Sequence, residues 1–149
     1  MKKLIILLFA SVLSLSSINA KAKSITLGWA AWDPANALQE LTKEFTAETG
    51  IDVNFEFVPW PNFADRMLNE LNNKGKTFDL LIGDSQWIGA GAVYGHYVKL
   101  NEFFDKEGIS MNDFSPATVY AYSTWPKGSE NYYALPAMGD ALAWAYRKD

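Results

Sequence analysis

Cysteine is absent from this chain of 149 residues, and histidine occurs once, at His96. Without cysteine the chain forms no disulfide and offers no thiol for lipid attachment at a processing site. A single histidine without cysteine does not make a usual zinc ligand set. We therefore predict neither a metal nor another cofactor.

Common catalytic and nucleotide-binding motifs are also missing. The chain has no phosphate-binding G-x-x-x-x-G-K-[ST] loop and no G-x-S-x-G nucleophile turn. The glycines from Gly89 to Gly95 do not form a G-x-G-x-x-G motif directly after a strand. His96 follows this irregular stretch, and a packing or surface role fits it better than that of a catalytic base. We predict no enzymatic activity and name no catalytic residue.

Positive charge is scarce, with 13 Lys and Arg against 17 Asp and Glu and a formal net charge of −4. Nucleic acids and anionic membranes both require basic patches, so neither is an expected partner. The length is sufficient for one modest hydrophobic core.

The N-terminus has the three-part pattern of a secretory signal peptide. Two lysines precede an apolar run at 4–15, and small and polar residues follow at 16–23. The run is shorter than the roughly twenty residues that a membrane-spanning helix needs. We predict a signal peptide at 1–22, cleaved after Ala20 or Ala22. Export without a lipid anchor favours an enclosed periplasm.

Strand-like and helix-like patterns alternate after the signal. Period-two alternation and short apolar runs predict strands at 24–30, 51–58 and 79–83. Helical spacing predicts helices at 34–49 and 62–73. This order is typical of right-handed parallel units with helices on both sheet faces. The predicted fold class is therefore α/β, with a parallel-dominated sheet flanked by helices.

Cap and turn residues mark the expected element ends. Asp33 before Pro34 predicts the start of the first helix, and Gly50 predicts a left-handed stop. Later elements are less regular: we expect a short helix near Gln86 and strands at 132–136 and 141–146.

Several phrases of the sequence resemble one protein family. They are FTAETGIDV at 45–53, FDLLIGD at 78–84, YALP at 133–136 and YRKD at 146–149. In this order and spacing they resemble the bacterial extracellular solute-binding proteins, family 1. These are the maltose-binding-protein-like, substrate-binding components of ABC sugar transporters. The resemblance covers 24–149.

The resemblance implies a type II periplasmic-binding-protein-like fold with two α/β lobes and a ligand cleft between them. Residues 23–140 correspond to the N-terminal lobe, and 141–149 to the start of the crossing into a second lobe. Because family members are longer, we expect the chain to be truncated there. The implied protein is a monomer that binds a small solute, such as a sugar, and delivers it to an ABC permease in the inner membrane.

Parallel sheets bind ligands beyond the carboxyl ends of their strands, and each predicted strand is followed there by a tryptophan. Indole rings can cover the apolar faces of a sugar, while carboxylates, amides and hydroxyls meet its polar edge. The resemblance adds a residue just before the crossing. The candidate ligand-binding residues are Trp32, Trp60, Asp84, Ser85, Gln86, Trp87 and Asp140.

Simpler roles compete with these assignments. Each candidate indole is equally compatible with ordinary loop packing, and Asp84 or Ser85 with a helix cap. A secreted glycosidase-like enzyme is the main alternative function, with Asp84 and Asp140 as the carboxylate pair. A sugar-sensing module without a transport role is another.

Overall fold

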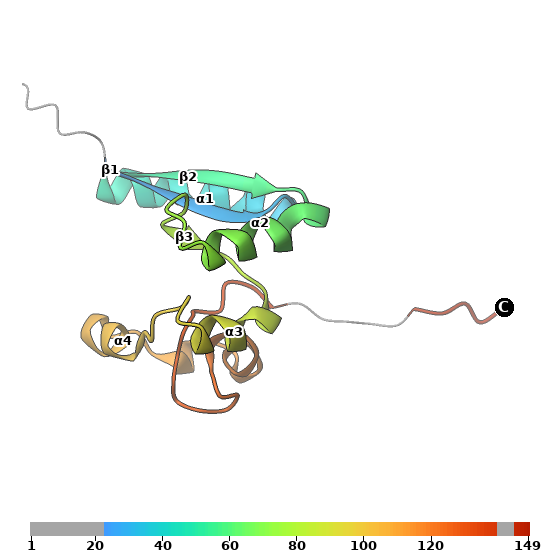
Figure 1. Cartoon of the computed structure of the whole chain (residues 1–149). Coiled ribbons are helices and arrows are strands. Elements are labelled where there is room, and N and C mark those ends of the chain that lie inside the picture. Colours follow the sequence, from blue (N-terminus) through green and yellow to red (C-terminus); the bar gives the residue numbers. More distant parts are fainter. Residues whose placement is uncertain (1–22, 140–144) are drawn as a thin grey trace, which may run out of the picture.

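The computed structural model describes residues 23–139 and 145–149 (Figure 1). The predicted signal peptide at 1–22 and the candidate residue Asp140 lie outside the described residues. The same holds for most of the predicted crossing strand at 141–146.

The first part of the described chain alternates strands and helices. In chain order the elements are β1 (Lys23–Ala30), α1 (Asp33–Thr49), β2 (Ile51–Val58), α2 (Trp60–Asn72) and β3 (Leu80–Leu81). These elements agree with the predicted order. Helix α2 begins earlier than predicted, because Pro61 fits the first turn of a helix. The backbone N–H groups of that turn have no acceptor within the helix, so proline, which lacks an N–H, loses no hydrogen bond there.

The strands form one sheet in the order β2-β1-β3, and both pairings are parallel. Strand β3 is shorter than the predicted strand at 79–83. The residues on either side of β3 still form hydrogen bonds with β1. The Asp79 N–H donates to the Thr26 carbonyl at 2.9 Å, and the Ile82 N–H donates to the Gly28 carbonyl at 3.0 Å. The Asp79 carboxylate accepts the Thr26 N–H at 2.8 Å, which replaces a ladder bond at this point. The predicted α/β class with a parallel sheet is confirmed.

Helix α1 confirms one predicted boundary and corrects the other. Trp32 is the N-cap residue, and no side chain caps the helix, so the prediction that Asp33 is the cap is wrong. Asp33 lies in the first turn instead, where a negative charge is favourable near the helix N-terminus. Gly50 ends the helix with φ of 69°, and its N–H donates to the Thr46 carbonyl at 2.8 Å.

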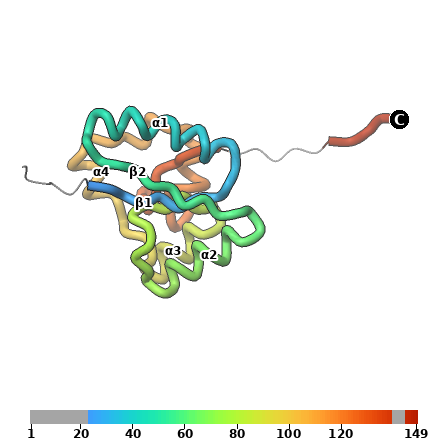
Figure 2. Tube along the Cα trace, turned by 90° about the horizontal axis from the view of Figure 1, so that it is seen from above, coloured from blue at the N-terminus to red at the C-terminus, as the bar shows by residue number. Residues whose placement is uncertain are grey.

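The two helices cover opposite faces of the sheet, as Figure 2 shows from above. This follows from two right-handed crossovers that run in opposite directions across the sheet, one from β1 to β2 through α1 and one from β2 past β1 to β3 through α2. Buried side chains from the sheet, from both helices and from the segment after β3 form the core. The buried core members are Leu27, Trp29, Ala30, Ala35, Val58, Phe63, Met67 and Trp87.

The chain after β3 forms a second layer of short helices beyond the sheet (Figure 1). These are η1 (Ser85–Trp87), α3 (Ile88–Val93), α4 (Asn101–Glu107), η2 (Met111–Asp113), α5 (Pro116–Thr118) and the π-helical turn η3 (Val119–Ser123). No helix in the described ranges has the length and apolar character needed to cross a membrane.

The predicted strand at 132–136 does not form. Only an isolated antiparallel bridge joins Tyr132 to Thr124. The backbone here bonds to separate partners: the Tyr132 carbonyl accepts from Leu100 N–H at 2.8 Å, and Tyr133 N–H donates to the Ser123 carbonyl at 2.8 Å. This segment therefore ties the layer of short helices together instead of extending a sheet.

Candidate functional site

The carboxyl ends of β1 and β2 lie at the same edge of the sheet because the strands are parallel. Trp32 lies two residues after the end of β1, and Trp60, the first residue of α2, lies two residues after the end of β2. The Ala31 N–H donates to the Val58 carbonyl at 2.8 Å, which joins the two loops. Two of the predicted indoles are thus brought to one edge.

Trp60 projects from this edge on top of a buried aromatic stack. Its side chain is 65% exposed, yet its ring stacks on Phe63 with centroids 5.8 Å apart and planes 21° apart. Phe63 is buried and packs against Trp87 with centroids 5.4 Å apart. The stack fixes one face of the Trp60 indole and leaves the other free for a planar partner.

Trp32 is held by the core tryptophan of β1. Its ring meets Trp29 edge to face, with centroids 5.6 Å apart and planes 89° apart. The Trp32 Nε1 is buried and has no hydrogen-bond partner among the described residues. Because a buried donor without an acceptor is costly, an acceptor is expected to complete this position.

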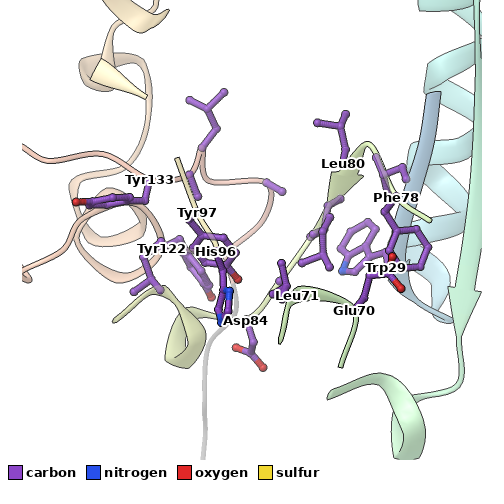
Figure 3. Close-up of a pocket in the computed structure, with 18 of the residues that line it drawn as sticks. Trp29, Glu70, Leu71, Phe78, Leu80, Asp84, His96, Tyr97, Tyr122 and Tyr133 are labelled. Carbon is purple, nitrogen blue, oxygen red and sulfur yellow. The ribbon is translucent and has the colours of Figure 1, made fainter. Parts of the chain in front are cut away.

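A large cavity lies between the sheet with α2 and the layer of short helices. Its volume is about 1220 Å³, and Trp32, Trp60 and Asp84 all line it. Figure 3 shows Trp29, Phe78 and Glu70 on one side, Tyr97, Tyr122 and Tyr133 on the other, and Asp84 at one end. Most of the walls are apolar or aromatic, and a few polar groups stand among them. This mixture is typical of small-molecule sites.

The three consecutive polar candidates separate around the turn after β3. Asp84 caps η1, with its Oδ1 accepting the Ser85 N–H at 2.8 Å, and lines the large cavity. Ser85 and Gln86 line a smaller groove on the other side of the turn. Trp87 is 7% exposed and belongs to the core under Phe63. The turn thus divides the predicted set between two spaces, and Asp140 lies outside the described residues.

An ion-pair network fixes α2 relative to the sheet beside the cavity. Arg66 contacts Glu56 at 3.2 Å and Glu70 at 2.9 Å, and its guanidinium lies 4.9 Å from the centre of the Phe78 ring. Glu70 also accepts the Thr77 N–H at 2.8 Å. This backbone hydrogen bond and the Arg66 side chain lower the pKa of Glu70. The hydrogen bond to Glu70, together with the charges of Glu56 and Glu70, raises the pKa of Arg66.

Several aromatic lining residues were not predicted from the sequence. Tyr97 packs so closely on Gly91 that a side chain there would overlap its ring, and burial raises the pKa of the Tyr97 hydroxyl. Tyr122 and Tyr133 reach the cavity from the π-helical turn and from the segment that follows it. They belong to irregular segments, where no period in the sequence marks which side chains face inward.

Comparison with known proteins adds the family context. The family model described as bacterial extracellular solute-binding protein matches residues 31–149. A search of curated proteins gave no match.

Solved structures of solute-binding proteins share the fold. An ABC transporter solute-binding protein from Agrobacterium radiobacter, in complex with ribitol, has a TM-score of 0.64 and 23% identity over 74% of this chain and 27% of its own. A periplasmic solute-binding protein from Pectobacterium atrosepticum has a TM-score of 0.54 and 19% identity over 70% of this chain and 26% of its own. An N-glycan transport solute-binding protein from Streptococcus pneumoniae has a TM-score of 0.51 and 20% identity over 66% of this chain and 22% of its own. The chain spans about a quarter of the length of these structures.

Proposed function

Because the chain belongs to the bacterial extracellular solute-binding protein family, we propose that it binds a sugar or a similar polyhydroxylated solute for an ABC importer. In this proposal the chain is exported to the periplasm by its signal peptide and contributes the N-terminal wall of a cleft between two lobes. The observation that carries the proposal is the exposed Trp60 ring, which is stacked on buried Phe63 at the carboxyl edge of the sheet.

The chemistry of this edge fits a sugar or polyol. The free face of Trp60 can cover the C–H face of a sugar ring, and its stacked face keeps the indole in place before the solute arrives. The Trp32 ring lines the same cavity, and the Asp84 carboxylate can accept a hydrogen bond from a hydroxyl of the solute. Asp140, which follows the described segment 23–139, is proposed to complete this polar edge.

The solved neighbours support the class of solute. One of them holds ribitol, and another is described as transporting N-glycans. Both molecules present many hydroxyl groups on a carbon skeleton. We carry only this shared chemistry over to the present chain.

The proposed mechanism is capture and delivery without chemical conversion. Solute that binds at the edge is enclosed when a second lobe closes about a hinge, a motion known for periplasmic binding proteins. The closed form then presents a surface that the permease recognises. Lobe closure strengthens the polar contacts because it removes water from around them.

Tryptophan fluorescence tests the proposal on the chain itself. Titration with ribitol, ribose, glucose, galactose and maltose should change the emission saturably for at least one solute, with millimolar or tighter affinity. Chromatography of the mixture should recover the solute unchanged. No saturable change with any of the five would contradict the proposal, and a hydrolysis product from maltose would favour a secreted carbohydrate enzyme.

A further inference from the structure

A smaller groove lies on the far side of the η1 turn from the large cavity. Its volume is about 390 Å³, and Ser85, Gln86, Tyr94, Trp125 and Lys127 line it. We call it the α3 groove, because Ile88, Gly89, Ala90 and Val93 of α3 also line it. Ile88 lines both spaces, so the groove and the large cavity lie on two sides of the same buried side chain.

Trp125 forms one wall of the α3 groove in a fixed position. An added Cβ on Gly89 would lie 2.9 Å from two atoms of the Trp125 ring, so the ring packs directly on the helix backbone. The Trp125 N–H donates to the Asn131 carbonyl at 3.2 Å, which anchors the loop from behind. The half-buried indole therefore gives the groove an aromatic wall of the kind that Trp60 gives the large cavity.

Lys127 brings a positive charge to the same groove, and no carboxylate of the described residues lies beside it there. Its ammonium donates to the Ala121 carbonyl, and it forms no ion pair among the described residues. No Asp or Glu of the described chain lines the groove. Partial burial lowers the pKa of Lys127, so an anionic partner would stabilise its charged form.

We propose that the α3 groove is a second subsite, which binds the carboxylate-bearing ring of an acidic sugar such as a uronate. The inference rests on the proposed function and deepens it, because Ser85 and Gln86, two of the predicted ligand-binding residues, line this groove and directly follow Asp84 of the large cavity. The Trp125 ring covers the sugar face, Ser85 and Gln86 meet hydroxyls, and Lys127 pairs with the carboxylate. Charge-assisted pairing of this kind is stronger than a neutral hydrogen bond.

Matched neutral and acidic sugars test the subsite by calorimetry. Glucose is compared with glucuronate and galactose with galacturonate, on the unmodified chain and on Lys127→Met and Lys99→Met. The unmodified chain should bind at least one uronate about fivefold to tenfold tighter than its neutral partner. Lys127→Met should abolish that preference by lowering the uronate affinity to that of the neutral sugar. Lys99→Met removes an exposed lysine outside the groove and should keep the preference.

A second variant tests the aromatic wall. Trp125→Ala should weaken uronate binding, and Trp125→Phe should restore part of it, because a smaller ring still packs on Gly89. Equal binding of neutral and acidic sugars, or a preference that survives Lys127→Met, would overturn the subsite while leaving the proposed function in place. If neither kind of sugar binds at all, the proposed function fails and the subsite fails with it.

Discussion

The ring of Trp60 stacks on Phe63 with centroids 5.8 Å apart and planes 21° apart, although Trp60 is 65% exposed and Phe63 only 3%. An exposed indole normally samples several rotamers, and ordering it on binding has an entropic cost. Packing against a buried ring reduces that cost beforehand. This pair is the reason to place the solute at the carboxyl edge of β1 and β2.

Trp60→Ala should weaken solute binding about tenfold and change stability little. The substitution removes the exposed stacking face, and a contribution of about 1.5 kcal/mol corresponds to such a loss. Leu41→Ala is the matched control, because Leu41 is 63% exposed on α1, away from the edge. Calorimetry and thermal unfolding check both variants, and equal affinities in the two would count against Trp60 as a binding residue.

Trp87→Ala should reduce stability more than it reduces binding. Trp87 is 7% exposed and packs against Phe63 in the core, so the cavity left behind should cost about 3–5 kcal/mol. Trp87→Phe keeps an aromatic ring there and should cost less. Denaturant unfolding measures both. If stability holds and solute binding alone is lost, Trp87 is a ligand wall and not a support for Phe63.

Glu70→Gln should destabilise the chain at neutral pH and have a smaller effect in acid. The Thr77 N–H and Arg66 lower the pKa of Glu70 in the fold, so its contribution is present above the unfolded value of about 4.3. That contribution is lost as the pH falls through the lowered folded pKa. Thermal unfolding measured from neutral pH down through the folded pKa tests this prediction. Glu44→Gln, at an exposed position of α1, is the control. An equal effect of Glu70→Gln at every pH would contradict this assignment.

Gly50→Ala should destabilise the chain by about 1–2 kcal/mol, because φ at this helix stop is 69°. Asparagine tolerates the left-handed region better, so Gly50→Asn should cost less. Thermal unfolding of the pair measures the difference. Equal stability of the two variants would show that the backbone conformation at this position does not determine the cost.

The sequence predicts those parts of the fold in which local patterns and tertiary packing agree. Strands β1 and β2 alternate with period two, and α1 ends at a glycine with the conformation that its position indicates. The cap at Asp33 was predicted wrongly because its side chain makes no capping bond once Trp32 adopts an extended backbone. Tyr132 likewise bonds to partners far away in the sequence, which no local pattern reveals.

The candidate site was predicted less completely, because a short turn divides it. Three consecutive residues, Asp84, Ser85 and Gln86, look like one polar group in the sequence, yet they line two spaces. Trp87 is buried in part by its contact with Phe63, a residue of α2 that is distant in the sequence. Strand order alone therefore indicates the edge at which the site lies but not which indole remains exposed.

The indole N–H signals in a proton–nitrogen correlation spectrum test the central claim most directly. During titration with a bound sugar or polyol, the Trp60 and Trp32 signals should shift together with one dissociation constant, while the signal of buried Trp87, which lines neither space, moves little. Assignment uses single Trp→Phe variants. If the Trp60 signal stays unmoved at solute concentrations that saturate binding elsewhere on the chain, the solute does not bind at this edge.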